Sequence, residues 1–265
     1  MREDAAPPSA TRRAMLAAWV AEVAFLPVAD AALRFGVTEV TVRADLAALE
    51  SAGALRRVRG GAIALRERET PVEATARRDA EVKDAIGRRA AAAVRPGTAI
   101  ILDVGSTTLA VAHALVSRHD LADVVVVTNG LGIALALEPA IPRLTVVLTG
   151  GTLRPLQHSL VNPMASRALQ DLHVDLAILG CNGIEESGRV SNLNLPEAEV
   201  KQAMLTASTR RLLVADAGKF RQSHLGTIGS LTDFAMLVTG GPGADELASS
   251  AEAFGCEPVL VEASR

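Results

Sequence analysis

The segment that begins at Gly36 constrains the fold of this chain more than any other stretch of its sequence. Gly36 allows a tight turn between two short helical patterns, and Thr38 is the hydroxyl residue that we expect to cap the second of them. In that helix Val42, Leu46 and Leu49 recur at positions i, i+4 and i+7, so they form one buried face. A basic hairpin that contains a Gly-Gly pair follows. This arrangement predicts a winged helix-turn-helix.

Two helical patterns precede this turn and supply the other helices of the unit. The first spans residues 9–23 and carries apolar residues three and four positions apart, with Ser9 or Thr11 as the expected cap. The second spans residues 28–35. Its inward-facing residues are predicted to be Val28, Ala32, Leu33 and Phe35.

The exposed surface of this unit is expected to contact double-stranded operator DNA. Residues 1–68 carry ten Arg and eight acidic residues, a net charge of +2, whereas the rest of the chain carries 17 basic and 22 acidic residues, a net charge of −5. Basic side chains on the hairpin would neutralise DNA phosphates, although Arg43 alternatively faces only solvent. The predicted DNA contacts are Thr38, Glu39, Val40, Thr41, Arg43, Ala44, Arg56, Arg57 and Arg59.

Composition and cysteine spacing exclude several other classes of protein. Cys181 and Cys256 lie far apart, and the five His residues form no HExxH pattern, so we expect a reducing compartment and no metal site. Apolar runs such as Val124–Val127 have the length of a strand and are too short to span a membrane. Residues 1–10 are polar and Pro-rich, unlike a secretory leader. We therefore expect a cytoplasmic protein that binds neither a membrane nor a cofactor.

The remainder of the chain alternates short apolar runs with helical patterns. Runs rich in Val, Ile and Leu indicate strands that are buried on both faces, which is typical of a mostly parallel α/β sheet covered by helices. Ligands of such sheets bind at the carboxyl ends of the strands. The predicted strands are Ala99–Leu102, Val124–Val127, Thr145–Leu148, Leu176–Leu179, Arg211–Val214, Ala235–Val238 and Val259–Val261.

We predict three parts for the chain. Residues 1–68 form the DNA-binding domain, residues 69–80 a linker and residues 81–265 the α/β sensing domain. The linker region is charged and contains Pro71, and a helix is expected to run from about Glu73 to Val94. A solvated linker, a hinge and a dimer contact are all compatible with its composition.

Small polar residues follow five of the predicted strands, and we expect them to line one pocket. Gly105, Ser106, Thr107 and Thr108 precede a helix, where N–H groups and hydroxyls suit a phosphate, although an ordinary capped turn uses the same residues. The other turns are Thr128–Gly130, Thr149–Gly151, Gly180–Gly183 and Asp216–Lys219. Lys201 and Lys219 suit a phosphorylated or acidic ligand, although Lys201 alternatively pairs with Glu197 at i,i+4.

Both halves of the chain resemble the DeoR family of bacterial sugar-metabolism repressors. The first half carries FGVTEVTVRADLAALESAGALRRVRGGA, and the second carries, in order, DVGSTTLAVAHAL, VVVVTNG, VVLTGGTLR, DLAILGCNGI, LPEAEVKQAML and LLVADAGKF. The resemblance implies an effector domain related to ribose-5-phosphate isomerase-type folds. It implies that GSTT holds a phosphate, with Asp103, Asn129, Asn182, Lys201 and Lys219 around the sugar. The predicted effector-binding residues are Asp103, Gly105, Ser106, Thr107, Thr108, Asn129, Gly150, Gly151, Asn182, Gly183, Glu199, Lys201 and Lys219.

Two residues depart from the pattern of the family. Ala44 stands where the family usually has Arg, which changes a possible phosphate or guanine contact. Asn182 stands where the related isomerases have a carboxylate, and an amide cannot act as a general base at neutral pH.

The function expected from these features is that of a homo-oligomeric repressor, a dimer or tetramer, of a sugar or carbohydrate catabolic operon. A phosphorylated sugar would control it, and no catalytic residue is predicted. Two alternatives remain: an enzyme similar to a phosphosugar isomerase or deaminase, and a regulator whose vestigial pocket serves only assembly.

Overall fold

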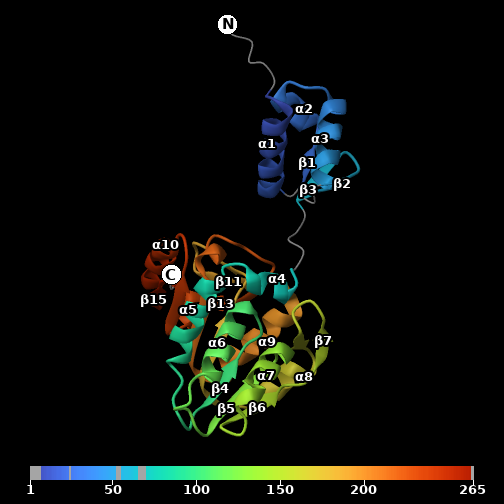
Figure 1. The fold of residues 1–265 in the computed structure, drawn as a ribbon. Coiled ribbons are helices and arrows are strands. Elements are labelled where there is room, and N and C mark those ends of the chain that lie inside the picture. The colour runs from blue at the N-terminus through green and yellow to red at the C-terminus, as the bar shows by residue number, and fades with distance from the viewer. Residues whose placement is uncertain (1–6, 24, 52–54, 65–69, 264–265) are drawn as a thin grey trace. The chain divides into compact units, whose positions relative to one another are not determined.

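A computed structural model describes residues 7–23, 25–51, 55–64 and 70–263 of the chain. The chain divides into two compact units, Met1–Arg68 and Glu69–Arg265. The first unit contains three helices, α1 (Ser9–Glu22), α2 (Val28–Phe35) and α3 (Glu39–Ser51), and a small antiparallel sheet (Figure 1). The sheet has the order β1-β3-β2, built from β1 (Leu26–Pro27), β3 (Gly61–Ala64) and β2 (Leu55–Val58).

The core of the first unit lies between the three helices and the hairpin. Its fully buried side chains include Leu16 on α1 together with Val42 and Leu46 on α3, as their spacing predicted. Leu33 was expected to face inward, but it is 87% exposed. On a helix, Leu33 lies about 140° around the axis from Val28, so the face that buries Val28 turns Leu33 to solvent.

Local signals at the helix ends agree with the predictions in part. Gly36 adopts a left-handed conformation (φ 61°) after α2, which glycine accommodates at low cost. The cap of α1 is Pro8, and neither Ser9 nor Thr11 serves as a side-chain cap. In the wing, Val58 pairs with Gly61, so Arg59 and Gly60 alone form the turn.

The second unit is built around a seven-stranded parallel sheet with the order β15-β14-β12-β9-β4-β5-β6. All seven predicted strands are present in this sheet, and the predicted α/β class is confirmed. Their bounds are β4 (Ala99–Leu102), β5 (Val124–Thr128), β6 (Leu144–Leu148), β9 (Val174–Gly180), β12 (Ser208–Asp216), β14 (Met236–Gly240) and β15 (Glu257–Val261).

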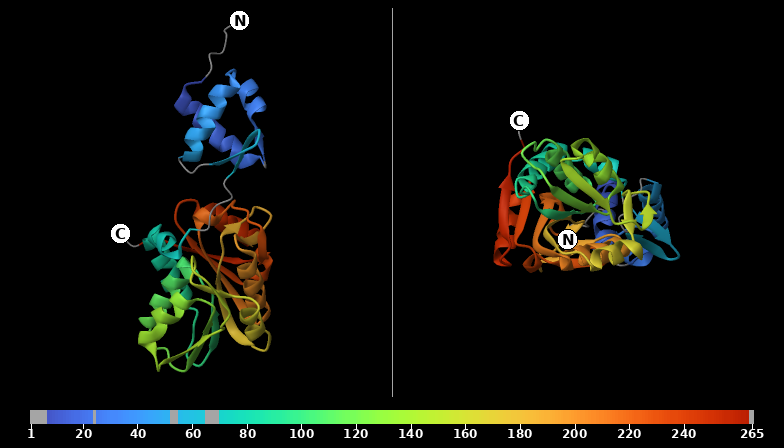
Figure 2. Two further views of the ribbon diagram at one scale, coloured as in Figure 1. Left: turned by 90° about the vertical axis from the view of Figure 1, so that its right-hand side faces the viewer. Right: turned by 90° about the horizontal axis from the view of Figure 1, so that it is seen from below.

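Helices cover both faces of this sheet (Figures 1 and 2). One face packs on α5 (Ala80–Ala91), α6 (Ser106–Val116) and α7 (Leu131–Leu137). The other packs on α8 (Met164–Gln170), α9 (Leu195–Thr206) and α10 (Ala244–Ala253). Successive side chains of each strand point alternately to these two faces of the sheet.

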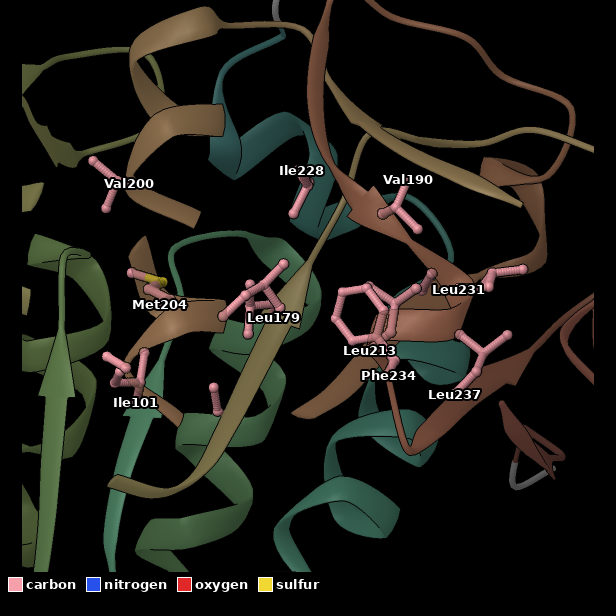
Figure 3. Packing of buried hydrophobic residues seen from close by; sticks show 14 of the residues in the cluster. Ile101, Leu179, Val190, Val200, Met204, Leu213, Ile228, Leu231, Phe234 and Leu237 are labelled. Carbon is pink, nitrogen blue, oxygen red and sulfur yellow. The ribbon is translucent and has the colours of Figure 1, made fainter. Parts of the chain in front are cut away.

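The side chains on the face covered by α5, α6 and α7 form a first hydrophobic cluster, and those on the opposite face form a second. In β9, for example, Ile178 belongs to the first cluster and Leu179 to the second. Figure 3 shows part of the second cluster, in which Met204, Leu213 and Phe234 pack together with other buried side chains. The strands at the centre of the sheet are therefore buried on both sides, which explains why they read as continuous apolar runs, whereas the edge strands β6 and β15 carry exposed residues.

Several shorter elements were not predicted. The strands β10 (Gly183–Ile184), β11 (Arg189–Asn192) and β13 (Gly226–Ser230) form a second sheet, and β7 (Thr152–Arg154) pairs with β8 (Ser159–Val161). Single turns of 3-10 helix occupy Glu138–Ala140, Ala217–Lys219 and Leu231–Asp233.

The region predicted as a linker differs from the expectation. A helix was expected from about residue 73 to residue 94, but the chain forms α4 (Val72–Arg77) and α5, separated by Asp79 with φ 53°. Residues 70–80 belong to the second compact unit, and α4 contacts α6. The left-handed residue redirects the chain between two short helices, so α4 packs on the domain instead of spanning solvent.

Candidate DNA interface and effector site

The N-terminal end of α3 presents the residues that were predicted to read DNA. The Thr38 hydroxyl accepts a hydrogen bond from the backbone N–H of Thr41 at 3.2 Å, so Thr38 caps the helix as predicted. Thr41 is half-buried. The side chains of Glu39, Val40, Arg43 and Ala44 are exposed. The helix thus offers a solvent-facing N-terminal surface of the kind that enters a DNA groove.

Arg43 forms an exposed ion pair with Glu39 one turn earlier, with Nη2 2.6 Å from Oε2. An exposed pair of this kind contributes about 0.2–1 kcal/mol. The free energy of releasing it is small compared with that of an arginine contact to a base. Glu39 therefore holds Arg43 in place without preventing it from contacting DNA.

The wing is tied to α3 by a second ion pair. The Nε atom of Arg57 lies 3.0 Å from Oε2 of Glu50, and the backbone N–H of Arg57 donates to the same carboxylate at 2.8 Å. Arg59 sits exposed in the two-residue turn. The backbone of Arg56 belongs to β2, whereas its side chain lies outside the described residues. Arg57 is thus placed beside α3, on the side where phosphates flank a helix that lies in a DNA groove.

A buried ion pair joins α1 to α3 and was not predicted. Arg12 Nε lies 2.6 Å from Asp45 Oδ2, and both side chains are 9% exposed. Asp45 is the acidic residue of the Arg-Ala-Asp-Leu segment, so this carboxylate holds the recognition helix instead of reaching DNA.

In the second unit the five polar turns lie along one edge of the sheet. The strands that precede them are adjacent in the order β12-β9-β4-β5-β6, and all of them run parallel, so their carboxyl ends share this edge. The turns therefore form a continuous row, which is the candidate effector site.

The centre of this row is a buried ion pair between Asp103 and Lys201. Asp103 Oδ2 accepts from Lys201 Nζ and from the backbone N–H of Gly180 at 3.1 Å, and Lys201 Nζ also donates to the Gly180 carbonyl at 3.0 Å. Asp103 is fully buried and Lys201 is 3% exposed. Lys201 thus bridges α9, β4 and β9, and the suggested pair between Lys201 and Glu197 does not form.

Asp103 keeps one acceptor without a protein partner. Its Oδ1 atom has no hydrogen bond among the described residues. Burial raises the pKa of Asp103 above its ordinary value, and the opposing charge of Lys201 only partly offsets that effect. A buried acceptor of this kind favours a bound hydroxyl or another donor, because an unmade hydrogen bond costs about 1–3 kcal/mol.

The loop from Gly105 to Thr108 opens α6 without a side-chain cap. Gly105 adopts φ 146°, which glycine tolerates, and the Thr108 hydroxyl donates to its carbonyl at 3.0 Å. The first N–H groups of a helix have no partner within the helix, so the N-terminus of α6, with Ser106 and Thr107, is suited to an anion.

Asn129 and Asn182 brace the site through their amides. Asn129 is fully buried and accepts from the backbone N–H of Val104 at 3.0 Å. Asn182 accepts from the backbone N–H of Leu193 at 3.0 Å. Both side-chain oxygens are therefore engaged by backbone groups, which assigns these residues to holding the loops in position.

Three predicted glycines have a structural reason. A Cβ atom on Gly151 (φ 126°) would lie 2.3 Å from the Val161 carbonyl oxygen, and one on Gly183 would lie 2.4 Å from that of Gln222. Gly150 has φ 71°, which favours glycine. These positions allow the backbone to pass closely through the edge of the site.

The structure places Glu199 away from the buried cluster. Its side chain is exposed and accepts a hydrogen bond from Asn162. Residues two positions apart on a helix lie about 200° apart around the axis, so α9 turns Glu199 outward when it turns Lys201 inward. The buried carboxylate of this helix is Glu197, which binds Arg154, Ser159 and Asn192.

Lys219 follows β12 in the turn of 3-10 helix and is half-buried. Among the described residues its ammonium makes no hydrogen bond or ion pair. Nearby, desolvation raises the pKa of the half-buried Cys181 thiol to about 12, although Lys219 and Lys201 oppose this effect. The thiol is therefore protonated at neutral pH and is not a nucleophile. Lys219 is the site's available cation.

Two residue groups of this edge were missed by sequence reasoning. The Glu197 network joins α9 to β7, β8 and β11, and its long-range partners leave no local pattern. Lys83 is 3% exposed and lies on α5. The sequence feature that could have pointed to Lys83 is the rarity of lysine. Only three of the 27 basic residues are lysines, and the other two lysines are Lys201 and Lys219.

Other kinds of site are not found in the described residues. No His, Cys, Asp and Glu side chains gather there in a group of three or more that would hold a metal ion. Within the same residues, no helix has the length and hydropathy needed to cross a membrane.

Comparison with known proteins connects both units to one family. The DeoR-like helix-turn-helix domain matches residues 12–68, and the DeoR C terminal sensor domain matches residues 78–241. The HTH-type transcriptional repressor CsqR of Escherichia coli (strain K12) is 30% identical over 83% of this chain and 83% of its own length. The glycerol-3-phosphate regulon repressor of the same strain is 29% identical over 78% of this chain and 81% of its own length.

Among solved structures, ribose 5-phosphate isomerase A from Methanocaldococcus jannaschii aligns with a TM-score of 0.39 and 17% identity, over 54% of this chain and 55% of that chain. The predicted family is confirmed by the two domain matches and by the relatives. The chain belongs to the DeoR family of transcriptional regulators.

Proposed function

We propose that this protein is a cytoplasmic repressor of an operon for the use of a sugar or related carbohydrate, and that a phosphorylated small molecule controls it. The observation that carries the proposal is the presence, on one chain, of an exposed recognition helix and a sheet edge with an uncapped helix N-terminus, a free lysine and an unpaired buried carboxylate oxygen. Relatives named as repressors, one of them the repressor of a glycerol-3-phosphate regulon, support it.

The roles follow from the chemistry of the edge. Ser106 and Thr107 at the start of α6 would bind the phosphate, and Lys219 would supply a positive charge beside it. The free Oδ1 atom of Asp103 would accept a hydrogen bond from a sugar hydroxyl. Asn182 offers no general base, so the proposal includes binding without turnover.

Control of DNA binding would depend on paired recognition helices. Dimeric helix-turn-helix proteins hold two such helices over half-sites one helical turn apart. We propose that the chain forms a homo-oligomer and that the ligand favours a state whose recognition helices no longer match that spacing.

A thermal-shift panel tests the proposal. The full chain is heated with ribose 5-phosphate, glucose 6-phosphate, glycerol 3-phosphate, their unphosphorylated counterparts and inorganic phosphate. A ligand present at 100 times its Kd stabilises the folded state by about 2.7 kcal/mol. We expect a rise in Tm with at least one phosphorylated compound and none with its unphosphorylated counterpart. Product formation from any compound would support an enzyme instead, and equal Tm values throughout would contradict the proposed sensing role.

A further inference from the structure

Lysine is rare in this chain, which indicates that each lysine has a specific role. Of 27 basic residues only Lys83, Lys201 and Lys219 are lysines. Lys201 and Lys219 belong to the candidate effector site, whereas Lys83 lies on α5 and is 3% exposed. A buried ammonium requires acceptors, because its desolvation is costly.

The acceptors of Lys83 lie at the end of α4. Its Nζ atom donates to the carbonyl oxygens of Thr75 and Arg78, each at 2.6 Å. The Thr75 carbonyl also accepts from the backbone N–H of Arg78 at 3.2 Å. Because the last carbonyls of a helix carry its negative dipole end, the ammonium stabilises this end of α4. A helix of six residues has little stability of its own, so α4 depends on such contacts.

The other end of α4 is held by the turn between β7 and β8. Gln157 Nε2 donates to the Thr70 carbonyl at 2.7 Å, and the backbone N–H of Val72 donates to that of Leu156 at 2.9 Å. The same turn reaches the candidate site, since the next residue, His158, accepts from the backbone N–H of Leu131 at 2.8 Å. This end of α4 is therefore attached to the loops that follow β5 and β6.

The N-terminal end of α4 borders the candidate site. A cavity of about 110 Å³ is bordered by Val72 and Glu73 of α4 and by Val104 and Gly105 at the start of the phosphate loop. Burial lowers the pKa of Lys83, Asp216 opposes this effect, and Lys219 adds to it. The electrostatic potential at Lys83 thus depends in part on the turn that contains Lys219.

We propose that Lys83 is a positioning residue that locks α4 beside the effector site and thereby transmits effector binding toward the DNA-binding unit. In the sequence, only residues 65–69 separate β3 of the wing from Thr70. A phosphate near Lys219 and Gly105 would change the charge and the space on the two sides that hold α4. This inference rests on the proposed sensing function and adds the element through which it acts.

Lys83→Met tests the lock, because methionine keeps the length of the side chain and removes the ammonium. Arg95→Gln is the matched control, since it removes one exposed positive charge just beyond α5. Hydrogen exchange of the full chain without ligand should show protection of residues 72–78 reduced by about tenfold or more in Lys83→Met, as expected when charge-assisted hydrogen bonds are lost. Arg95→Gln should match the wild type. Unchanged protection in Lys83→Met would overturn the proposal.

The ligand response gives the second measurement. With whichever compound of the panel stabilises the wild type, Lys83→Met should still gain Tm, but the ratio of operator Kd with and without that compound should fall toward one. If Lys83→Met keeps the full wild-type ratio, Lys83 does not transmit effector binding through α4. The proposed sensing function is not contradicted by that result. Should no compound act on the wild type, the sensing function fails, and this proposal fails with it.

A second variant guards against a folding defect in Lys83→Met. Gln157→Ala removes the hydrogen bond at the opposite end of α4 from a half-buried turn residue. It should also lower exchange protection of residues 72–78 and weaken the operator response. Wild-type behaviour of Gln157→Ala in both measurements would count against α4 as the transmitting element.

Discussion

At the scale of single residues, the ion pair of Asp103 and Lys201 dominates the electrostatics of the sensor unit. Both groups are almost fully buried, and each also bonds to the backbone of Gly180. Removing one member of such a pair leaves an uncompensated buried charge, which costs about 3–5 kcal/mol. The pair therefore fixes the geometry of the edge more than it adds net stability.

Lys201→Met should lower the free energy of unfolding by about 3–5 kcal/mol, as measured by urea denaturation. In an Asp103→Asn background the same substitution should cost at least about 1 kcal/mol less, because no carboxylate is then stranded. Equal losses in the two backgrounds would show that the residues do not act as a pair.

The loss caused by Lys201→Met should also depend on pH. Burial raises the folded-state pKa of Asp103 above its ordinary value of 3.8, and removing Lys201 takes away the main opposing charge. A carboxyl with a raised folded pKa favours folding while it is protonated, and this advantage disappears as pH rises through that pKa. The loss should thus be largest at neutral pH and shrink as pH falls toward 4. A pH-independent loss would contradict this assignment.

Arg43 offers a residue-scale prediction for the DNA surface. Arg43→Ala should weaken operator binding by about 1–3 kcal/mol if the guanidinium contacts a base, as measured by fluorescence anisotropy with operator DNA. Arg34→Ala is the control, because Arg34 stacks on Trp19 with its guanidinium 4.3 Å from the ring centroid and lies on α2. An unchanged Kd for Arg43→Ala would show that this side chain only faces water.

At the scale of elements, the apolar strands were predicted from the sequence and the more polar ones were not. The seven strands of the parallel sheet were predicted because each contains a run of apolar residues, as in β5 with its four consecutive valines. The strands β10, β11 and β13 were missed because Gly, Ser, Asn and Arg interrupt them, and their pairing depends on contacts distant in sequence. The break between α4 and α5 was missed because it depends on Asp79 and on the tertiary contacts of Lys83.

The site divides in the same way. Adjacent parallel strands explain why the turns that contain Asp103, Asn129 and Lys219 share one edge, which the pattern of elements predicted. The choice between Glu197 and Glu199 depended on the rotation of α9, which a weakly amphipathic sequence does not reveal. Two partners of Glu197 lie about 40 residues away and the third is in the short strand β11, so no local motif pointed to them.

Two helical glycines allow an element-scale test of packing between α5 and α6. A Cβ atom on Gly87 would lie 2.6 Å from the backbone of Ala110 on α6, whereas one on Gly132 of α7 meets no atom within 4 Å. Gly87→Ala should therefore destabilise the protein by about 1–3 kcal/mol through overpacking. Gly132→Ala should stabilise it by about 0.5–1 kcal/mol through the helix propensity of alanine. Urea unfolding of both variants measures this, and similar changes in the two would contradict the close approach of α5 and α6.

At the scale of the whole molecule, the two units of the chain differ in net charge. Residues 1–68 have a net charge of +2 and the remainder has −5, so the sensor unit is not itself drawn to DNA. Any effect of a ligand of this unit on operator binding would then pass through the chain that connects the two units. Such a link is reciprocal, because a ligand that weakens operator binding by a given factor must itself bind the operator complex more weakly by that factor.

Lys219→Ala tests this link with the whole protein, because it removes the site's available cation without touching the DNA-binding unit. The variant should bind operator with the wild-type Kd and should lose the response to the phosphorylated compound that acts on the wild type. In the wild type, calorimetric titration of that compound with and without operator should give a ratio of Kd values equal to the ratio found when operator is titrated with and without the compound. Lys219→Ala should bring both ratios to about one. If Lys219→Ala instead keeps the wild-type ratios, the effector does not bind beside Lys219; if the two wild-type ratios differ from each other, ligand and operator are not coupled through one equilibrium.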